Sequence, residues 1–148
     1  MTQEEIARSL EAYRLAKDSH DVQAVIDLRT EDCVDHTVAT DVRLEGKAAI
    51  ARYFTAFFDA VPDYRGKFEG AAYGTDCAVV WGHFVGTVSQ QLFGVRVDGS
   101  RRLHVPCVFV LTFRDGQVVE DRMYWDAATV AEQLGLAVET IRAPKASP

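Results

Sequence analysis

The chain has 148 residues, of which 48% are hydrophobic and 26% are charged. This length and apolar content predict one domain with its own core. Sixteen basic and 22 acidic residues give a net charge of −6, so neither a nucleic acid nor an anionic membrane is expected as a partner, because both bind basic surfaces. No apolar run approaches the roughly 20 residues that a membrane span needs.

The N-terminus and the cysteines favour a cytoplasmic protein. The first ten residues contain two glutamates and no apolar segment, which is not typical of a secretory signal. Cys33, Cys77 and Cys107 are odd in number and widely spaced, and no C-x-x-C pattern occurs. We therefore expect free thiols in a reducing compartment.

Three helices are predicted in the N-terminal half. Thr2 followed by Glu5 is a capping-box pattern, and the apolar spacing then predicts a helix to about residue 18. Asp21 is the expected N-cap of a short second helix. A broad aromatic stripe predicts a third helix at about 47–60.

Strands account for most of the remaining chain. A short strand is predicted at 33–38, and four more at about 64–73, 76–89, 102–113 and 117–125. Asp126 is expected to begin a last helix, which Gly135 ends. The domain is expected to cover 1–138, followed by a flexible tail at 139–148.

The order of helices followed by an antiparallel meander predicts an α+β domain, with helices on one face of a curved sheet. Residues 78–88 and 103–113 are apolar on both sides of their strands, although a helix-covered antiparallel sheet needs only one apolar face. A second subunit is the expected cover, so we predict a homodimer through the outer sheet face. The alternative is an apolar outer surface that is simply tolerated.

Two long segments carry a resemblance to a known family. Residues 44–63, LEGKAAIARYFTAFFDAVPD, resemble the helix and following Pro-Asp of SnoaL-like polyketide cyclases. Residues 86–136 resemble the C-terminal half of these proteins, with a Gly-Thr segment, a basic strand start, an Asp-Gly hairpin and a closing D…QLG in the same order. The resemblance spans about residues 3–136.

The resemblance implies the cone-shaped nuclear-transport-factor-2-like (cystatin-like) fold. In this fold a strongly bent antiparallel sheet wraps round three N-terminal helices, a short helix ends the chain, and an apolar pocket is enclosed. Ketosteroid isomerases and limonene epoxide hydrolases share the cone, so the fold alone does not determine the activity.

The resemblance also implies a cyclase or isomerase that needs no cofactor. Its substrate would be a hydrophobic polyketide-like or polycyclic ketone, from which a proton alpha to a carbonyl is removed for an intramolecular aldol reaction. Histidine suits proton transfer near neutral pH, so His36 and His104 are the candidate bases. Tyr13 matches a phenol on the first helix of ketosteroid isomerases and is the candidate donor.

Each candidate has a structural alternative. Tyr13 and His36 could form an interior hydrogen-bonded pair without a role in catalysis, and His104 could lie on the surface. In SnoaL-like cyclases a catalytic Asp lies near the start of the strand at 103–113, where this sequence has none. His20 is expected to be exposed, and His83 to lie in the core or in an interface.

The expected pocket lining is mostly aromatic. It comprises Tyr53, Phe57, Trp81, Phe109, Tyr124 and Asp126. An Asp at the start of a helix accepts hydrogen bonds from the free N–H groups of the first turn, so Asp126 is expected mainly as a cap and only secondarily as a pocket acid.

The sequence lacks residues that other reactions known for this fold require. A steroid isomerase of the usual kind needs a protonated acid where Phe109 stands. Limonene epoxide hydrolase chemistry needs an Asp–Arg–Asp set, but Asp121 and Arg122 are adjacent and so face opposite sides of a strand. No metal-ligand spacing or nucleotide motif occurs, so we expect no metal and no cofactor. The alternative from another class is a non-catalytic module that binds an apolar small molecule.

Overall fold

The computed structural model describes residues 1–92 and 94–142, and it has the predicted α+β architecture. The helices are α1 (Gln3–Asp18), α2 (Val22–Asp27), α3 (Lys47–Ala60), α4 (Ala127–Leu134) and α5 (Val138–Arg142), with a 3₁₀ turn η1 at Val38–Thr40. The strands are β1 (Arg29–Thr37), β2 (Val42–Glu45), β3 (Arg65–Tyr73), β4 (Cys77–Val88), β5 (Gln91–Leu92), β6 (Val95–Arg96), β7 (Arg101–Arg114) and β8 (Gln117–Trp125).

The N-terminal helices begin where the capping residues predict. The Thr2 hydroxyl accepts a hydrogen bond from the Glu5 N–H, and the Glu5 carboxylate accepts one from the Thr2 N–H, so the capping box is confirmed. The Asp21 carboxylate accepts a hydrogen bond from the N–H of Ala24 and caps α2. Both caps fix the ends of helices that lie against the sheet.

Six strands form one sheet in the order β2-β1-β8-β7-β4-β3. All neighbours are antiparallel except β1 and β8, which run parallel, so the predicted simple meander is wrong at this point. The four-residue strand β2 was not predicted, and neither was the small β5–β6 hairpin between the predicted strands at 76–89 and 102–113. Both elements are too short for a periodic apolar pattern to reveal them.

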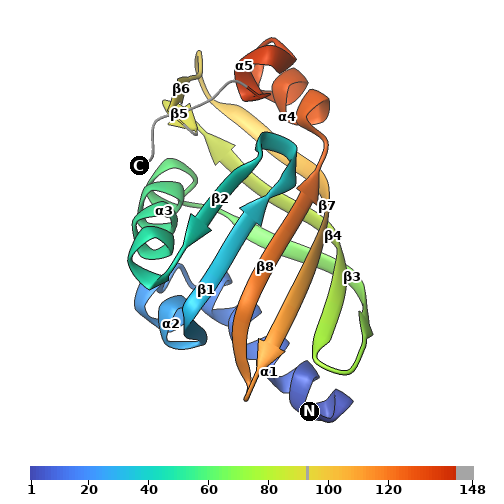
Figure 1. Cartoon of the computed structure of the whole chain (residues 1–148). Helices are drawn as coiled ribbons and strands as arrows, with labels where there is room; N and C mark the ends of the chain where they lie inside the picture. The colour runs from blue at the N-terminus through green and yellow to red at the C-terminus, as the bar shows by residue number, and fades with distance from the viewer. Residues whose placement is uncertain (93, 143–148) are drawn as a thin grey trace.

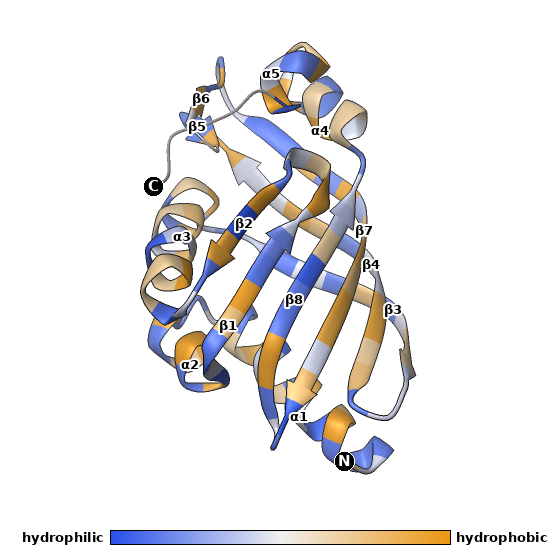
Figure 2. Ribbon diagram, in the orientation of Figure 1, coloured by the Kyte–Doolittle hydropathy of each residue, from blue (hydrophilic) through white to orange (hydrophobic). Residues whose placement is uncertain are grey.

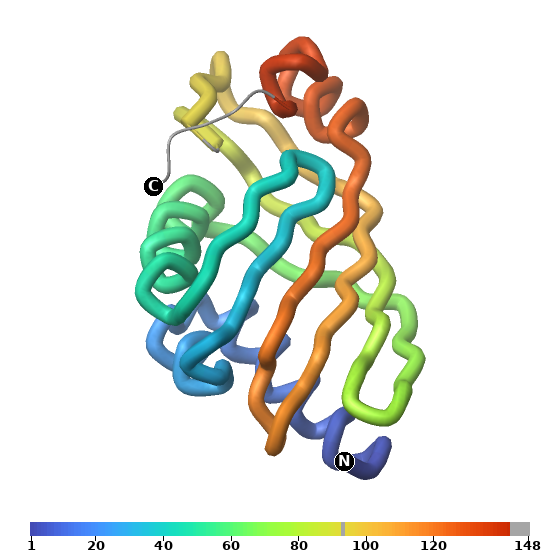
Figure 3. The backbone as a smooth tube through the Cα atoms, viewed as in Figure 1, coloured from blue at the N-terminus to red at the C-terminus, as the bar shows by residue number. Residues whose placement is uncertain are grey.

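The sheet bends into a half-open cone around α1, α2 and α3 (Figure 1). The tube drawing shows the long strands β4 and β7 curving along their length (Figure 3). A side chain at Gly82 would place Cβ 2.2 Å from the Lys67 carbonyl oxygen, at the point where the β3–β4 register shifts between Phe68 and Gly70. Glycine therefore permits the close backbone approach that accompanies this irregularity.

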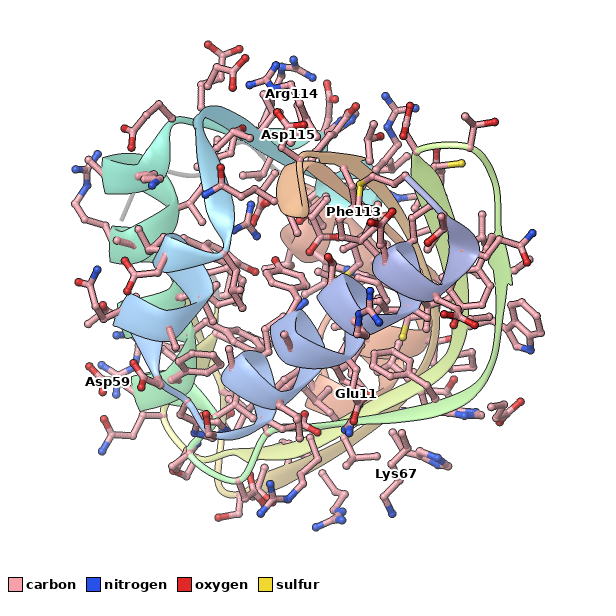
Figure 4. The ribbon with its side chains drawn as sticks, turned by 90° about the horizontal axis from the view of Figure 1, so that it is seen from below. Glu11, Asp59, Lys67, Phe113, Arg114 and Asp115 are labelled. Carbon is pink, nitrogen blue, oxygen red and sulfur yellow. The ribbon has the colours of Figure 1, made fainter. Side chains whose placement is uncertain are left out.

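The core lies between the concave face of the sheet and the helices. On β7 every second side chain is buried on this face, namely Leu103, Val105, Cys107, Phe109, Leu111 and Phe113. Hydrophobic residues recur along β4 and β7 (Figure 2). Viewed from below, α1 crosses the open face of the curved sheet, and the charged side chains of Asp59 and Lys67 lie at the edge of the molecule (Figure 4).

The C-terminal helices cover the end of the sheet where β8 finishes (Figure 1). Gly135 ends α4 in the left-handed conformation, as predicted. The predicted flexible tail from residue 139 is wrong in part, because Val138–Arg142 form α5 and Ile141 is buried in the core. Residues 143–148 lie outside the described residues. None of the described helices has both the length and the apolar character for a membrane span.

Candidate functional site

A pocket lies between the concave face of the sheet and helices α1 and α3. It contains about 600 Å³ of empty space, its open mouth included. Most of its wall is apolar or aromatic, with Val42, Leu44, Tyr53, Phe54, Phe57, Tyr64, Phe84, Phe109, Met123 and Trp125. Its polar lining comes from Lys17, Asp35, His36, Thr37 and Asp121. An apolar cavity with a few convergent polar groups is the usual form of a small-molecule site.

Two carboxylates face this pocket from neighbouring strands. Asp35 on β1 and Asp121 on β8 are directly paired in the parallel register of these strands. Asp121 shares the inner side of β8 with Met123 and Trp125, which also line the pocket. The side chains of Asp35 and Asp121 are only 13% and 4% exposed. Two carboxylates placed this way need nearby cations, because water does not screen them.

Arg29 provides one of these cations. Its side chain is fully buried, and Nη1 lies 2.5 Å from Asp35 Oδ1, whereas Nη2 lies 3.8 Å from Asp121 Oδ2. Nη2 also donates to the Tyr13 hydroxyl, which in turn donates to Asp121 Oδ2 at 2.8 Å. The Asp–Arg–Asp set that Asp121 and Arg122 could not form is therefore present, with Arg29 between Asp35 and Asp121.

Lys17 provides the second cation. Its Nζ lies 3.5 Å from Asp121 Oδ2, and the side chain is 8% exposed. The ammonium also lies over aromatic rings, 4.4 Å from the ring centre of Phe109 and 5.2 Å from that of Tyr13. Carboxylate and ring faces together offset the cost of burying the charge. Lys17 thus brings a positive charge to the pocket wall.

The surroundings change the acidity of two of these groups. Burial, with a further contribution from Asp121, raises the pKa of Asp35 to about 6, although Arg29 opposes the shift. Burial also raises the pKa of the Tyr13 phenol well above its usual value, so Tyr13 stays protonated. Asp35 can therefore take up and release a proton near neutral pH, which is what a general base requires.

Several predicted site residues do lie at or beside the pocket. Tyr53, Phe57 and Phe109 line it. Tyr13 is buried beneath it, where its hydroxyl joins Arg29 to Asp121. The phenol O–H of Tyr13 is thus already engaged as a hydrogen-bond donor to the carboxylate of Asp121.

Three predicted pocket residues lie elsewhere, and these placements were wrong. Trp81 and Tyr124 are on the outer face of the sheet, with 41% and 39% of their surface exposed. The alternation along each strand explains this placement, because the neighbours of Trp81 and Tyr124 fill the inner face. The exposed Asp126 does not line the pocket, but its expected main role as the cap of α4 is confirmed, since its carboxylate accepts hydrogen bonds from the Thr129 N–H and hydroxyl.

The histidines also differ from expectation. His104 is exposed on the outer face, where its ring stacks on His83 at 4.5 Å between centroids. His36 borders the pocket, but its Nε2 lies 3.1 Å from the exposed Asp41 carboxylate. His20 is half-buried rather than exposed, with Nε2 2.9 Å from the Tyr64 carbonyl oxygen.

The orientation of His36 follows from its strand neighbours. His36 pairs with Arg43 on β2 and with Arg122 on β8, and these side chains are 51% and 41% exposed. Side chains in register share one face of a sheet, so the His36 side chain leaves β1 on the outer side, although His36 still contributes to the border of the pocket. Asp35, the adjacent residue, faces inward. The structure therefore brings Asp35, rather than either predicted histidine, to the inner site.

Sequence reasoning missed four charged residues, Lys17, Arg29, Asp35 and Asp121. One signal was available for Asp121, because it alternates with Met123 and Trp125 along a predicted strand. No comparable signal marks Arg29, which lies two residues after the end of the short helix α2. Among the residues that the structure describes, no group of three or more His, Cys, Asp or Glu is arranged to hold a metal ion.

Comparisons with known proteins agree with this architecture. The model of a family described as SnoaL-like polyketide cyclase matches residues 7–134. No curated protein matches the chain. A Shewanella denitrificans structure described as a SnoaL-like polyketide cyclase has a TM-score of 0.80 and 19% identity, over 88% of this chain and 96% of that chain.

Two further structures have similar folds. AclR from Streptomyces galilaeus, described as a hydroxylase, has a TM-score of 0.76 and 19% identity, over 97% of this chain and 89% of that chain. A Catenulispora acidiphila protein with a ketosteroid isomerase-like fold, in complex with trimethylamine, has a TM-score of 0.75 and 17% identity, over 88% of this chain and 95% of that chain. These likenesses confirm the predicted cone-shaped fold.

Proposed function

Because the chain belongs to the SnoaL-like polyketide cyclase family, we propose that it catalyses a cofactor-independent proton transfer on a hydrophobic ketone, leading to ring closure or isomerisation. The observation that supports this proposal is the carboxylate of Asp35, which lines an apolar pocket and whose pKa burial raises to about 6. A base with this pKa is largely ionised at neutral pH and still binds a proton well.

In the proposed reaction, the Asp35 carboxylate removes a proton from the carbon next to the substrate carbonyl. The electron pair of the C–H bond moves to the carbonyl oxygen and forms an enolate. The Lys17 ammonium, which also lines the pocket, stabilises the negative oxygen electrostatically. Arg29 holds Asp35 in place through its hydrogen bond.

The enolate can then react in two ways, and in both of them the atoms and charges balance. In ring closure its carbon attacks a second carbonyl of the same molecule, a C–C bond forms, and the new alkoxide receives the proton from Asp35. In isomerisation Asp35 returns the proton to a different carbon. Neither route needs an oxidant, a reductant or an outside nucleophile. The aromatic wall of the pocket suits a flat, apolar substrate.

The base in this proposal is Asp35 instead of His36 or His104. The His104 ring lies on the opposite side of the sheet from the pocket, and the His36 imidazole pairs with Asp41. Tyr13 acts indirectly, because its hydroxyl holds Asp121 and Arg29. The proposal thus keeps the reaction class that the sequence suggested but assigns the proton transfer to another residue.

Exchange of α-protons provides a test without knowledge of the natural substrate. The protein is incubated in D₂O with apolar bicyclic ketones such as 1-tetralone, and deuterium incorporation next to the carbonyl is followed by NMR. We expect exchange above the buffer rate for the native protein and a loss of at least about 100-fold in Asp35→Asn, as for removal of a general base. The matched control, His104→Gln, should exchange at the native rate.

Other outcomes would redirect the proposal. If His36→Gln abolished exchange and Asp35→Asn did not, the base would be His36 and the present assignment would be wrong. If ketones bound to the native protein but no ketone of the panel exchanged, a non-catalytic binding module would be the better description.

The Asp35–Arg29–Asp121 set also favours a second candidate, the addition of water to an epoxide. Asp121 would take a proton from a water molecule while the oxygen of that water attacks a carbon of the epoxide ring. Asp35 in its protonated form would give a proton to the oxygen of the breaking C–O bond. Formation of a diol from an apolar epoxide, without ketone exchange, would support this candidate instead.

A further inference from the structure

One oxygen of the buried carboxylate pair has no partner among the described residues. Asp121 Oδ1 is a buried side-chain atom without a hydrogen bond. The groups that neutralise Asp121 all approach the other oxygen, Oδ2. They are the Tyr13 hydroxyl at 2.8 Å, Lys17 Nζ at 3.5 Å and Arg29 Nη2 at 3.8 Å. Burying a carboxylate oxygen without a hydrogen-bond donor costs free energy. Oδ1 is therefore an unsatisfied acceptor that a donor group of a ligand would stabilise.

The place of Asp121 indicates where that donor comes from. Asp121 lines the apolar pocket and is 4% exposed, so bulk water reaches it poorly. The remaining wall near it is formed by carbon-rich side chains such as Met123 and Phe109. The donor therefore has to arrive with whatever occupies the pocket.

The charges around Asp121 indicate the nature of that donor. Lys17 and Arg29 carry two positive charges, and ionised Asp35 and Asp121 carry two negative charges, so the cluster is neutral as a whole. An ammonium group at Oδ1 would add an uncompensated charge beside Lys17 and Arg29. A neutral hydroxyl satisfies Oδ1 without changing the charge balance.

We propose that Asp121 Oδ1 is a recognition group for a substrate hydroxyl, and that the substrate is a neutral hydroxylated ketone. This inference rests on the proposed function, in which a ketone occupies the pocket. Asp35 and Asp121 are paired across neighbouring strands, which are spaced by about 5 Å. The hydroxyl therefore lies on the same ring as the acidic carbon or on the ring next to it.

Matched ligands test the proposal on the native protein. The probes are 5-, 6- and 7-hydroxy-1-tetralone, their methyl ethers and unsubstituted 1-tetralone, and their dissociation constants are measured by calorimetry. A hydrogen bond to a carboxylate predicts that one hydroxy isomer binds at least about tenfold more tightly than both its methyl ether and 1-tetralone. Affinities within about twofold for all three members of each set would overturn the proposal.

Asp121→Asn provides a sharper test, because its geometry is constrained. Tyr13, Lys17 and Arg29 all offer protons to the Oδ2 position, so the amide oxygen should occupy it. The amide NH₂ group then takes the place of Oδ1 and becomes a donor. We expect the preference for the hydroxy compound to be lost, because a hydroxyl oxygen and a methyl ether oxygen can both accept a hydrogen bond from this NH₂ group.

A control variant and a second measurement distinguish the possible outcomes of this test. Glu120→Gln removes one negative charge from the outer side of the same strand, where Glu120 pairs with Arg122, and it should leave the preference unchanged. A folded Asp121→Asn variant, checked by circular dichroism, that still preferred the hydroxy compound would overturn the proposal. If Asp121→Asn does not fold, the native ligand series decides alone. Isotope exchange tests the proposed function and affinity tests this inference, so each can fail separately.

Discussion

At the scale of single residues, the site is a balance of buried charges. The carboxylates of Asp35 and Asp121 occupy paired positions on neighbouring strands, where two negative charges repel each other. Arg29 and Lys17 compensate them, and the Tyr13 hydroxyl holds Asp121 and Arg29 together. The raised pKa of Asp35 is a consequence of this arrangement, because burial and Asp121 together outweigh the effect of Arg29.

The first prediction concerns the pH dependence of proton exchange. Asp35 acts in its ionised form, so the exchange rate should rise as the pH rises through about 6, the pKa of this group. Lys17 lowers the pKa of Asp35, and Lys17→Met should therefore move this rise to higher pH. The profile is measured by NMR between pH 4 and 9. A rise at unchanged pH in Lys17→Met would mean that Lys17 does not influence the base.

The second prediction concerns stability. Tyr13→Phe removes the hydroxyl that donates to Asp121 and accepts from Arg29, and it leaves both partners buried. The free energy of unfolding should fall by about 1–3 kcal/mol, the cost of unsatisfied buried polar groups. Urea denaturation followed by circular dichroism measures the change. Tyr73→Phe, on an exposed tyrosine, is the matched control and should unfold like the native protein.

At the scale of elements, the sequence predicted the long periodic segments well. The helix at 47–60 and the strand at 117–125 have the predicted bounds, because apolar spacing and turn residues mark both. The faces of β4 were harder to assign. Its residues are apolar on both sides, so alternation alone could not decide that Phe84 faces inward and Trp81 outward.

The site itself was beyond reach of these local signals. Asp35 and Asp121 are 86 residues apart in the sequence, and only the parallel pairing of β1 with β8 brings them together. Arg29 belongs to a residue type that is rarely fully buried, so its place in the sequence does not predict a position in the interior. The ordinary pKa of histidine makes it the obvious candidate base in a sequence, whereas burial moves the pKa of Asp35 into the same range.

The third prediction separates architecture from chemistry at the end of β8. Asp126→Ala removes the carboxylate that accepts from the N–H and hydroxyl of Thr129 at the start of α4. We expect a melting temperature lower by a few degrees, because the first turn of α4 loses its cap. Tetralone binding and exchange should stay at native levels, since Asp126 is exposed and does not line the pocket. A loss of exchange in a folded variant would restore Asp126 as a site residue.

At the scale of the whole molecule, the outer face of the sheet is a second apolar surface. Trp81, Val108 and Tyr124 lie side by side on β4, β7 and β8, because their positions are paired in register. Gly70 on β3 leaves room for the indole, since a Cβ there would lie 2.4 Å from Trp81 Cζ2. Large exposed aromatic side chains in one row are typical of a protein interface rather than of a free surface.

We propose that a second copy of the chain covers this row, as the apolar outer strands suggested. The fourth prediction is that light scattering after gel filtration gives twice the 16.4 kDa mass of one chain at micromolar concentration. Trp81→Glu places a charge in the middle of the row and should yield monomers, because an unpaired charge in an apolar interface is costly. Leu15→Glu, which alters an exposed leucine on α1 behind the sheet, should remain dimeric. A native protein that elutes as a monomer, or Trp81→Glu and Leu15→Glu variants of equal mass, would rule out this face as the interface. Because the pocket lies on the concave side of the sheet, dissociation by Trp81→Glu should leave proton exchange intact.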